Sequence, residues 1–218
     1  VADAVGAVYW SPVLEGDAVT VEVFTTNANA PSLDAGLRVV QVSHLFVSAM
    51  NPRVGSLAKA SGACEVDLVC LSASDAALAN SGKATAKMTI TDSAGSTGLC
   101  TGTLLNTIGS TGQNYFFTAN HCFNEGGRAE QSTVSTISTI WSYERSACGG
   151  GSVGSLQIGG GGRLLYADAP TDVLLLRLNR TPPPGAVFSG WDANAVALGT
   201  RLWAVHHPAG DVKKVSLG

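Results

Sequence analysis

Hydrophobic and polar side chains alternate along several short segments of this 218-residue chain, which is the pattern of a strand with one buried face. The clearest case is residues 18–25, where three valines alternate with Thr20 and Glu22. Residues 37–46 predict a second strand. Because two strands are marginally stable alone, we expect residues 1–46 to form a small β extension that packs on a larger body.

Pro, Gly and Ser interrupt residues 47–62, and this composition predicts a linker without regular structure. Residues 63–218 follow as the main domain. Their apolar runs are short and bounded by turn residues, which favours an all-β architecture. We expect one or two helical turns at 74–80 and strands at 84–91, 101–106, 115–118, 173–178 and 202–206.

The segment 173–178 is almost continuously apolar, which predicts a strand buried on both faces. Glycine clusters lie at 149–151 and 159–162. No helical pattern follows either cluster, as a nucleotide-binding loop would require. We therefore interpret both clusters as flexible hairpin loops.

Composition narrows the class of protein. Charged residues make up 13% of the chain and the formal net charge is −3, which argues against a disordered chain and against an electrostatic nucleic-acid binder. No apolar run approaches the roughly 20 residues of a membrane-spanning helix. The chain begins at Val1 rather than Met, so we expect a processed or trimmed piece.

Five cysteines are spread through this Gly-rich sequence, and none forms a CxxC pair. That spacing argues against a zinc ribbon or a thioredoxin-like site. It favours disulfides and an oxidising compartment. An odd number leaves one cysteine without a partner in this chain.

The stretch 99–123 contains the strongest candidate chemistry. Its two apolar strands are joined by a polar turn, so closing the hairpin brings Cys100 close to Cys122. His121 lies beside the second cysteine, where the strand gives way to a tight turn. A ring whose neighbour is covalently fixed suits a general base. The alternative is a stapled hairpin that carries a surface histidine.

Two aspartates are candidates for an acid that orients this base. Asp172 lies 51 residues after His121, at the start of the run 173–178. A carboxylate there can be shielded from water and aimed at the imidazole N–H. Asp172 is otherwise a turn-capping residue, and Asp168 is its rival.

Two motifs frame the predicted hairpin: Cys-Thr-Gly-Thr-Leu-Leu-Asn at 100–106 and Phe-Thr-Ala-Asn-His-Cys at 117–122. Together they resemble the Cys-x-Gly-x-Leu-(Val/Leu) … Thr-Ala-x-His-Cys core of chymotrypsin-like serine proteases, most closely the bacterial lysyl endopeptidase branch. The similarity extends from about Cys64 to Lys214. Further segments match in the same order, namely 62–70, 141–143 with Cys148, 172–178, 190–192 and 206–208.

The resemblance implies a chymotrypsin-like double β-barrel, with residues 63–218 forming the first barrel and the start of the second. It implies a secreted bacterial serine endopeptidase that acts on protein or peptide substrates, with cleavage after Lys or Arg. The expected enzyme is a monomer that needs no cofactor or metal and binds neither membrane nor nucleic acid.

Site residues also follow from the resemblance. His121 falls on the position of the general base, and the pattern Asp-x-x-Leu-Leu-x-Leu places Asp172 rather than Asp168 on that of the acid. The family pairing implies a disulfide between Cys70 and Cys148. Cys64 is then unpaired in this chain, with its partner expected beyond Gly218.

The nucleophile of such a protease lies in a Gly-x-Ser-Gly turn, and none of the 218 residues forms one. By resemblance, that turn is expected roughly a hundred residues beyond Gly218, so this chain alone should be inactive. The alternatives are an inactive homologue that works as a binding module, and a β scaffold without a site. His206 and His207 predict no metal site, because adjacent strand residues point to opposite faces.

Lys59 is the only lysine of the linker and lies five residues before Cys64. A lysine-selective protease that cleaved between Lys59 and Ala60 would release residues 1–59 as a pro-segment, since an exposed linker is accessible to proteolysis. The alternative is that residues 1–46 are a permanent module and Lys59 is a solvated linker charge.

Overall fold

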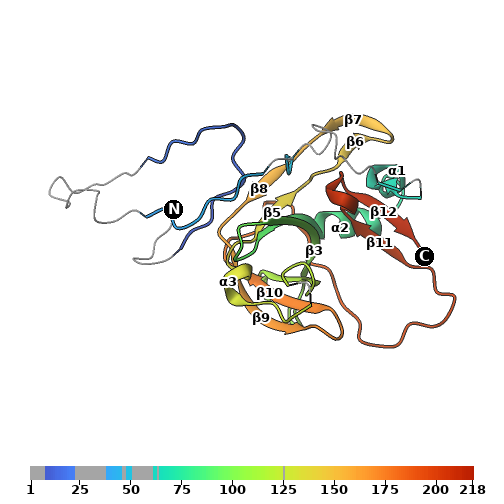
Figure 1. Cartoon of the computed structure of the whole chain (residues 1–218). Coiled ribbons are helices and arrows are strands. Elements are labelled where there is room, and N and C mark those ends of the chain that lie inside the picture. Colours follow the sequence, from blue (N-terminus) through green and yellow to red (C-terminus); the bar gives the residue numbers. More distant parts are fainter. Residues whose placement is uncertain (1–7, 23–37, 46–47, 51–60, 63, 125) are drawn as a thin grey trace.

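Antiparallel strands dominate the computed structural model, which describes residues 8–22, 38–45, 48–50, 61–62, 64–124 and 126–218. The largest sheet has seven strands in the order β8-β5-β2-β3-β4-β10-β9 (Figure 1). This architecture agrees with the all-β prediction. In chain order its strands are β2 (Thr85–Thr91), β3 (Thr97–Leu105), β4 (Tyr115–Ala119), β5 (Ser138–Trp141), β8 (Leu156–Ile158), β9 (Gly162–Asp168) and β10 (Val173–Leu178).

The seven-stranded sheet curves around one hydrophobic core (Figure 1). Phe116 of β4 lies at its centre, fully buried, with its ring edge-on to Trp141 at a centroid distance of 6.2 Å. Gly102 of β3 makes room for this ring, since a Cβ there would lie 2.2 Å from a Phe116 ring carbon. Leu104, Leu174 and Met88 fill the core around it, among others.

A smaller sheet combines β1 (Val66–Asp67), β12 (Lys214–Leu217) and β11 (Trp203–His206) in the order β1-β12-β11. A separate hairpin joins β6 (Arg145–Ala147) to β7 (Gly150–Val153). The disulfide between Cys70 and Cys148 ties α1 (Leu68–Ser72) to this hairpin.

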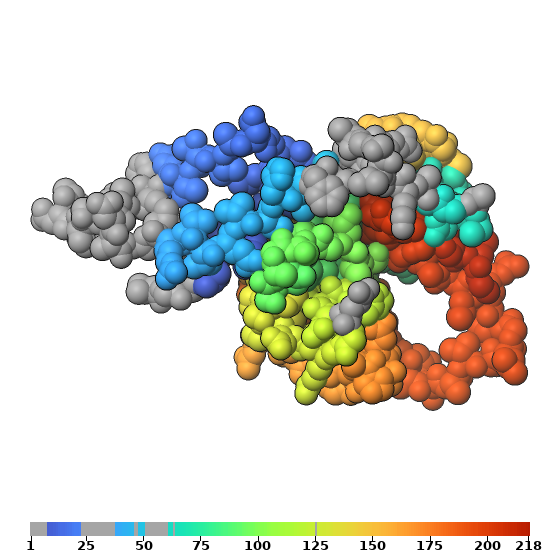
Figure 2. All heavy atoms as spheres, in the orientation of Figure 1, coloured from blue at the N-terminus to red at the C-terminus, as the bar shows by residue number. Residues whose placement is uncertain are grey.

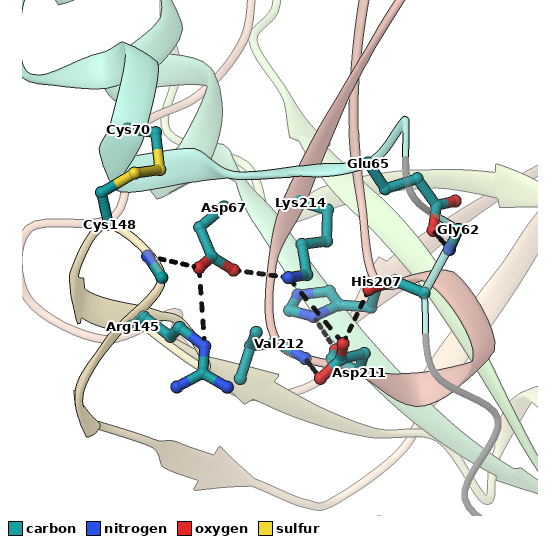
Figure 3. A network of polar contacts seen from close by, with 12 residues as sticks. Gly62, Glu65, Asp67, Cys70, Arg145, Cys148, His207, Asp211, Val212 and Lys214 are labelled. Carbon is teal, nitrogen blue, oxygen red and sulfur yellow. Dashed lines mark hydrogen bonds and ion pairs between the residues drawn. A yellow bond between two sulfur atoms is a disulfide. The ribbon is translucent and has the colours of Figure 1, made fainter.

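Buried Asp67 fastens these parts to one another (Figure 3). Its carboxylate accepts a hydrogen bond from the Lys214 ammonium at 2.5 Å and one from the Gly149 N–H at 3.1 Å. The Arg145 Nε lies 3.5 Å away. One acid therefore connects β1, β12 and the β6–β7 hairpin, and its buried charge is fully paired.

The other helices are short: α2 (Ala76–Ala84), α3 (Gln131–Val134) and the 3-10 turn η2 (Pro208–Gly210). The predicted helical turns at 74–80 correspond to α2, which begins after Asp75 accepts a hydrogen bond from the Leu78 N–H. In the described part of the chain, every helix is too short or too polar to span a membrane.

The prediction that 173–178 is buried on both faces is wrong. Leu174, Leu176 and Leu178 are buried, whereas Arg177 is exposed. The run instead has one face on the core, and β4 and β9 pair with its two edges. A continuous apolar run can thus belong to a strand whose two edges are paired, and not only to a strand whose two faces are buried. In β10 both edges are paired and only one face is fully buried.

The predicted strands of the N-terminal extension do not form in the part that is described. Residues 18–22 and 38–45 are in no strand, and Val19, Val21 and Val42 are more than half exposed. Figure 2 shows 38–45 against the β2–β3 hairpin, to one side of the barrel. The segment contacts that hairpin through side-chain hydrogen bonds. Gln41 Nε2 donates to the Asp92 carbonyl, and the Ser43 hydroxyl donates to the Gly95 carbonyl. Alternation without a backbone partner does not make a strand.

Candidate active site

His121 lies in the tight turn that follows β4. The carbonyl of Asn120 accepts hydrogen bonds from the N–H groups of Phe123 and Asn124, at 2.9 and 3.1 Å, which closes the turn. The disulfide from Cys122 back to Cys100 of β3 holds the same turn on its other side. The His121 side chain is 59% exposed, so its position depends on this backbone rather than on packing around the ring.

Asp172 precedes β10 in the chain but lies beside His121 in space. The antiparallel register pairs Val173 with Ala119, which brings the residue before β10 next to the residues after β4. Asp172 has a left-handed backbone, with φ of +55°. Non-glycine residues rarely adopt this conformation, and at functional sites it aims a side chain.

The two side chains make a two-point contact. Asp172 Oδ2 lies 2.7 Å from His121 Nδ1, and Asp172 Oδ1 accepts the His121 backbone N–H at 2.8 Å. These bonds, the backbone one foremost and then that of the ring, lower the pKa of the Asp172 carboxyl from its ordinary value. A carboxylate at Nδ1 favours the tautomer with its proton there, which leaves the Nε2 lone pair free to accept a proton.

The rival aspartate has a different partner. Asp168 Oδ2 accepts the Thr171 N–H at 3.1 Å and also the Thr171 hydroxyl. Asp168 therefore holds the turn that leads into Asp172, as a capping residue does.

A cleft of about 410 Å³ opens beside His121. Its walls include residues 97–100 of β3 and residues 121–123 of the histidine turn. Both polar and apolar residues line the cleft, and His121 is one of them.

Cys100, His121 and Cys122 lie close enough for their ligand atoms to surround an ion, within 4.8 Å of one another. Both sulfurs form the Cys100–Cys122 disulfide. A disulfide offers no thiolate to a metal, so this cluster is a covalent link beside the histidine and has no metal-binding chemistry. The structure also pairs Cys70 with Cys148 and has Cys64 as an exposed free thiol.

His206 and His207 make separate contacts. His206 Nε2 lies 2.9 Å from the Ser216 hydroxyl, while His207 donates from Nδ1 to the Asp211 carbonyl. Burial, and then the nearby Lys213 ammonium, hold the pKa of His207 well below its ordinary value, so this ring is neutral and structural.

Two buried polar side chains escaped the sequence analysis. Asn120 is 2% exposed and binds the backbone at Gly127 and Ala129. Lys87, in the middle of β2, is fully buried and donates to the carbonyls of Ala49 and Gly210. For both Asn120 and Lys87, the only signal in the sequence was a polar residue within an apolar stretch. The predicted processing site, Lys59 and Ala60, lies outside the described residues.

Comparison with known proteins places these features in a family. The family model "Lysyl endopeptidase, C-terminal domain" matches residues 58–218, and "Lysyl endopeptidase N-terminal domain" matches residues 2–46. A lysyl endopeptidase of Pseudomonas aeruginosa is 42% identical over an alignment of 216 residues, and the match covers 96% of this chain and 46% of the relative. The chain thus spans about half the length of the curated relative it matches.

Among solved structures, the HtrA-type protease AlgW with tripeptide is 17% identical, with a TM-score of 0.44 over 65% of this chain and 37% of that one. The family models and the Pseudomonas relative decide the assignment. The chain belongs to the lysyl endopeptidase family.

Proposed function

We propose that His121 and Asp172 are the general base and the orienting acid of a secreted bacterial serine endopeptidase that cleaves protein or peptide chains after lysine. The observation that supports this function best is the two-point contact of Asp172 with the ring and the backbone of His121. The cleft beside the ring offers an extended polypeptide access to it. Lysine preference is proposed from the name of the 42% identical relative.

The serine is proposed to come from the part of the family that these 218 residues do not span. Its hydroxyl would give its proton to His121 Nε2 as the oxygen attacks the peptide carbonyl carbon. Asp172 would stabilise the imidazolium that forms. The imidazolium would then return the proton to the leaving amine, and a water activated by the same ring would hydrolyse the acyl-enzyme.

We also propose that residues 1–59 are a pro-segment, released by cleavage between Lys59 and Ala60. A lysine-selective enzyme would accept its own linker as a substrate, which gives the bond a role in activation. Amino-terminal sequencing of the active protein tests this proposal. A chain that begins at Ala60 supports it, whereas full activity with an intact amino terminus contradicts it.

The function is tested by substitution at the pair, in the protein as its gene encodes it and with peptides that carry Lys, Arg or a neutral residue before the cleaved bond. His121→Ala should lower kcat by on the order of 10⁴-fold or more, and Asp172→Asn by about 10³- to 10⁴-fold. Cleavage of the lysine peptide should exceed that of the others.

Asp168→Asn is the matched control, because Asn caps a turn as Asp does, and it should change kcat by less than about tenfold. A wild-type protein that binds these peptides without cleaving them would instead be an inactive homologue that acts as a binding module. Equal losses from Asp168→Asn and Asp172→Asn would remove Asp172 from the proposed role.

A further inference from the structure

The position of His121 depends on the residue before it. The His121 ring is more than half exposed, so packing around it contributes little to its orientation, and an exposed hydrogen-bonded pair is weak by itself. What fixes the ring is the backbone at 120–121, which gives its two N–H groups to Asp172. The N–H of Asn120 donates to the Asp172 carbonyl at 3.2 Å, and that of His121 donates to the carboxylate at 2.8 Å.

Asn120 anchors this backbone through its side chain, which is almost completely buried. Its Nδ2 donates to the Gly127 carbonyl at 2.7 Å, and its Oδ1 accepts the Ala129 N–H at 2.9 Å. The amide orientation is determined, because the reverse assignment would set donor against donor and acceptor against acceptor. Neither alanine nor aspartate can make both bonds.

The same residue also begins the turn around the histidine. Its carbonyl accepts the N–H groups of Phe123 and Asn124. The backbone N–H, the carbonyl and the carboxamide of Asn120 are therefore all satisfied by different segments: Asp172, the histidine turn, and residues 127 and 129. A displacement of the backbone at 120–121 would therefore have to strain or break bonds to all three segments.

We propose that Asn120 is a positioning residue, whose buried carboxamide holds His121 in register with Asp172. This inference rests on the proposed function of the pair, but its central contact can be measured without any catalysis. Removing the carboxamide leaves the Gly127 carbonyl and the buried Ala129 N–H without their partner. The turn should then relax and weaken the His121–Asp172 contact.

The test follows Asp172 by carbon-detected NMR on the 218-residue chain, comparing wild type with Asn120→Ala. Hydrogen bonds from His121 lower the pKa of Asp172, so that pKa should rise toward its ordinary value in the variant. Exchange of the His121 backbone N–H should accelerate by roughly ten- to a hundredfold, as expected for loss of buried hydrogen bonds.

Asn124→Ala is the matched control. It removes an Asn side chain that also donates to this loop, at the Arg128 carbonyl, but from the exposed side. It should leave both the Asp172 titration and the His121 exchange as in wild type. If Asn120→Ala does not fold, Asn120→Ser, which keeps at most one of the two bonds, takes its place with the same measurements.

One result would overturn the proposal: amides at 127–129 that exchange faster while the Asp172 titration stays as in wild type. Asn120 would then hold only that loop. These readouts do not use peptidase activity, so an inactive protein would contradict the proposed function and leave this result intact. In an active protein, Asn120→Ala should lower kcat more than it raises KM, because it misplaces the base rather than the substrate.

Discussion

Residues 85–91 and residues 18–22 both alternate apolar and polar side chains, but only residues 85–91 form a strand. Every residue of β2 is buried, on its polar face as well as its apolar one, whereas residues 18–22 are exposed throughout. The difference lies in the neighbours: β2 pairs with β3 on one edge and with β5 on the other. A strand is stabilised by its partners, and alternation alone only permits it.

Lys87 of β2 contacts the N-terminal part of the chain at Ala49, outside residues 18–22. Its ammonium lies 4.5 Å from the centre of the Tyr143 ring and donates to Gly210 at 2.6 Å and to the carbonyl of Ala49. Ala49 is 2% exposed and packs with Ile140 and Tyr143, so it is the most deeply seated residue of the described N-terminal segment. A buried lysine of β2 thus binds the backbone at Ala49, near the start of the linker.

The largest expected effect comes from removing a core side chain of the seven-stranded sheet, compared with removing an exposed side chain of the N-terminal segment 38–45. Phe116→Ala should lower the free energy of unfolding by about 3–5 kcal/mol, because it leaves a cavity beneath the sheet. Val42→Ala should change it by less than about 0.5 kcal/mol, since Val42 is 77% exposed. Urea unfolding curves measure both. Equal losses would mean that the N-terminal segment packs as tightly as the barrel.

The second prediction concerns the pH dependence of the free energy of unfolding, which we expect from Lys87. Burial lowers the pKa of Lys87 from 10.5 to about 8, against an opposing effect of Asp211. Between these two values the unfolded chain binds the proton and the folded chain does not, so stability must rise with pH. The gain is at most about 3 kcal/mol. Lys213, whose pKa is also lowered by burial, contributes in the same direction.

Lys87→Met isolates the contribution of Lys87. The variant should be less stable at pH 10.5, where it lacks the hydrogen bonds to Ala49 and Gly210, and should gain less than wild type between pH 8 and 10.5. Lys213→Met removes the other buried lysine whose pKa is lowered, so its stability should also rise less with pH than that of wild type. Parallel pH profiles for wild type and Lys87→Met, from urea unfolding at each pH, would contradict the assignment.

Local features of the sequence marked His121 and left Asp172 and Asp168 as alternatives, and the family resemblance favoured Asp172. His121 follows a short apolar strand between two cysteines, and Asp172 opens another, so the pairing of β4 with β10 brings them together. Asn120 and Lys87 could not be interpreted in this way. Their partners are backbone groups, in the case of Lys87 at separations of 38 and 123 residues, and a backbone group has no signature in the sequence.

The opposite error was made at the N-terminal valines, where the sequence pattern predicted a strand that does not form in the described residues. Their alternation is as clear as that of β2, but an edge to pair with is a property of the fold and not of the segment. The same applies to the run 173–178, whose second face is partly buried at Val173 and Leu175 and exposed at Arg177. The pattern indicates which structure a segment can adopt, and its neighbours in the fold determine which structure it does adopt.

The smallest expected effect is at Ser43, where the N-terminal segment touches the β2–β3 hairpin. Its hydroxyl donates to the Gly95 carbonyl at 2.8 Å and lies 2.7 Å from the Thr97 hydroxyl, which in turn lies 2.8 Å from that of Thr91. Because each hydroxyl has one proton, donation by Ser43 to Gly95 leaves it to accept from Thr97. Ser43→Ala therefore removes the first hydroxyl from a hydrogen-bonded series of three.

We expect Ser43→Ala to lower the free energy of unfolding by less than about 1 kcal/mol, as for one neutral, partly buried hydrogen bond. Amides at 38–45 should nevertheless exchange about three- to tenfold faster in hydrogen-exchange mass spectrometry, while β4 and β10 stay as in wild type. Ser74→Ala, which removes an exposed hydroxyl bonded to the Leu71 carbonyl, should leave 38–45 unchanged. If Ser43→Ala also leaves these amides unchanged, the segment is held by the Lys87–Ala49 bond and by the apolar contacts of Leu45 rather than along the hairpin.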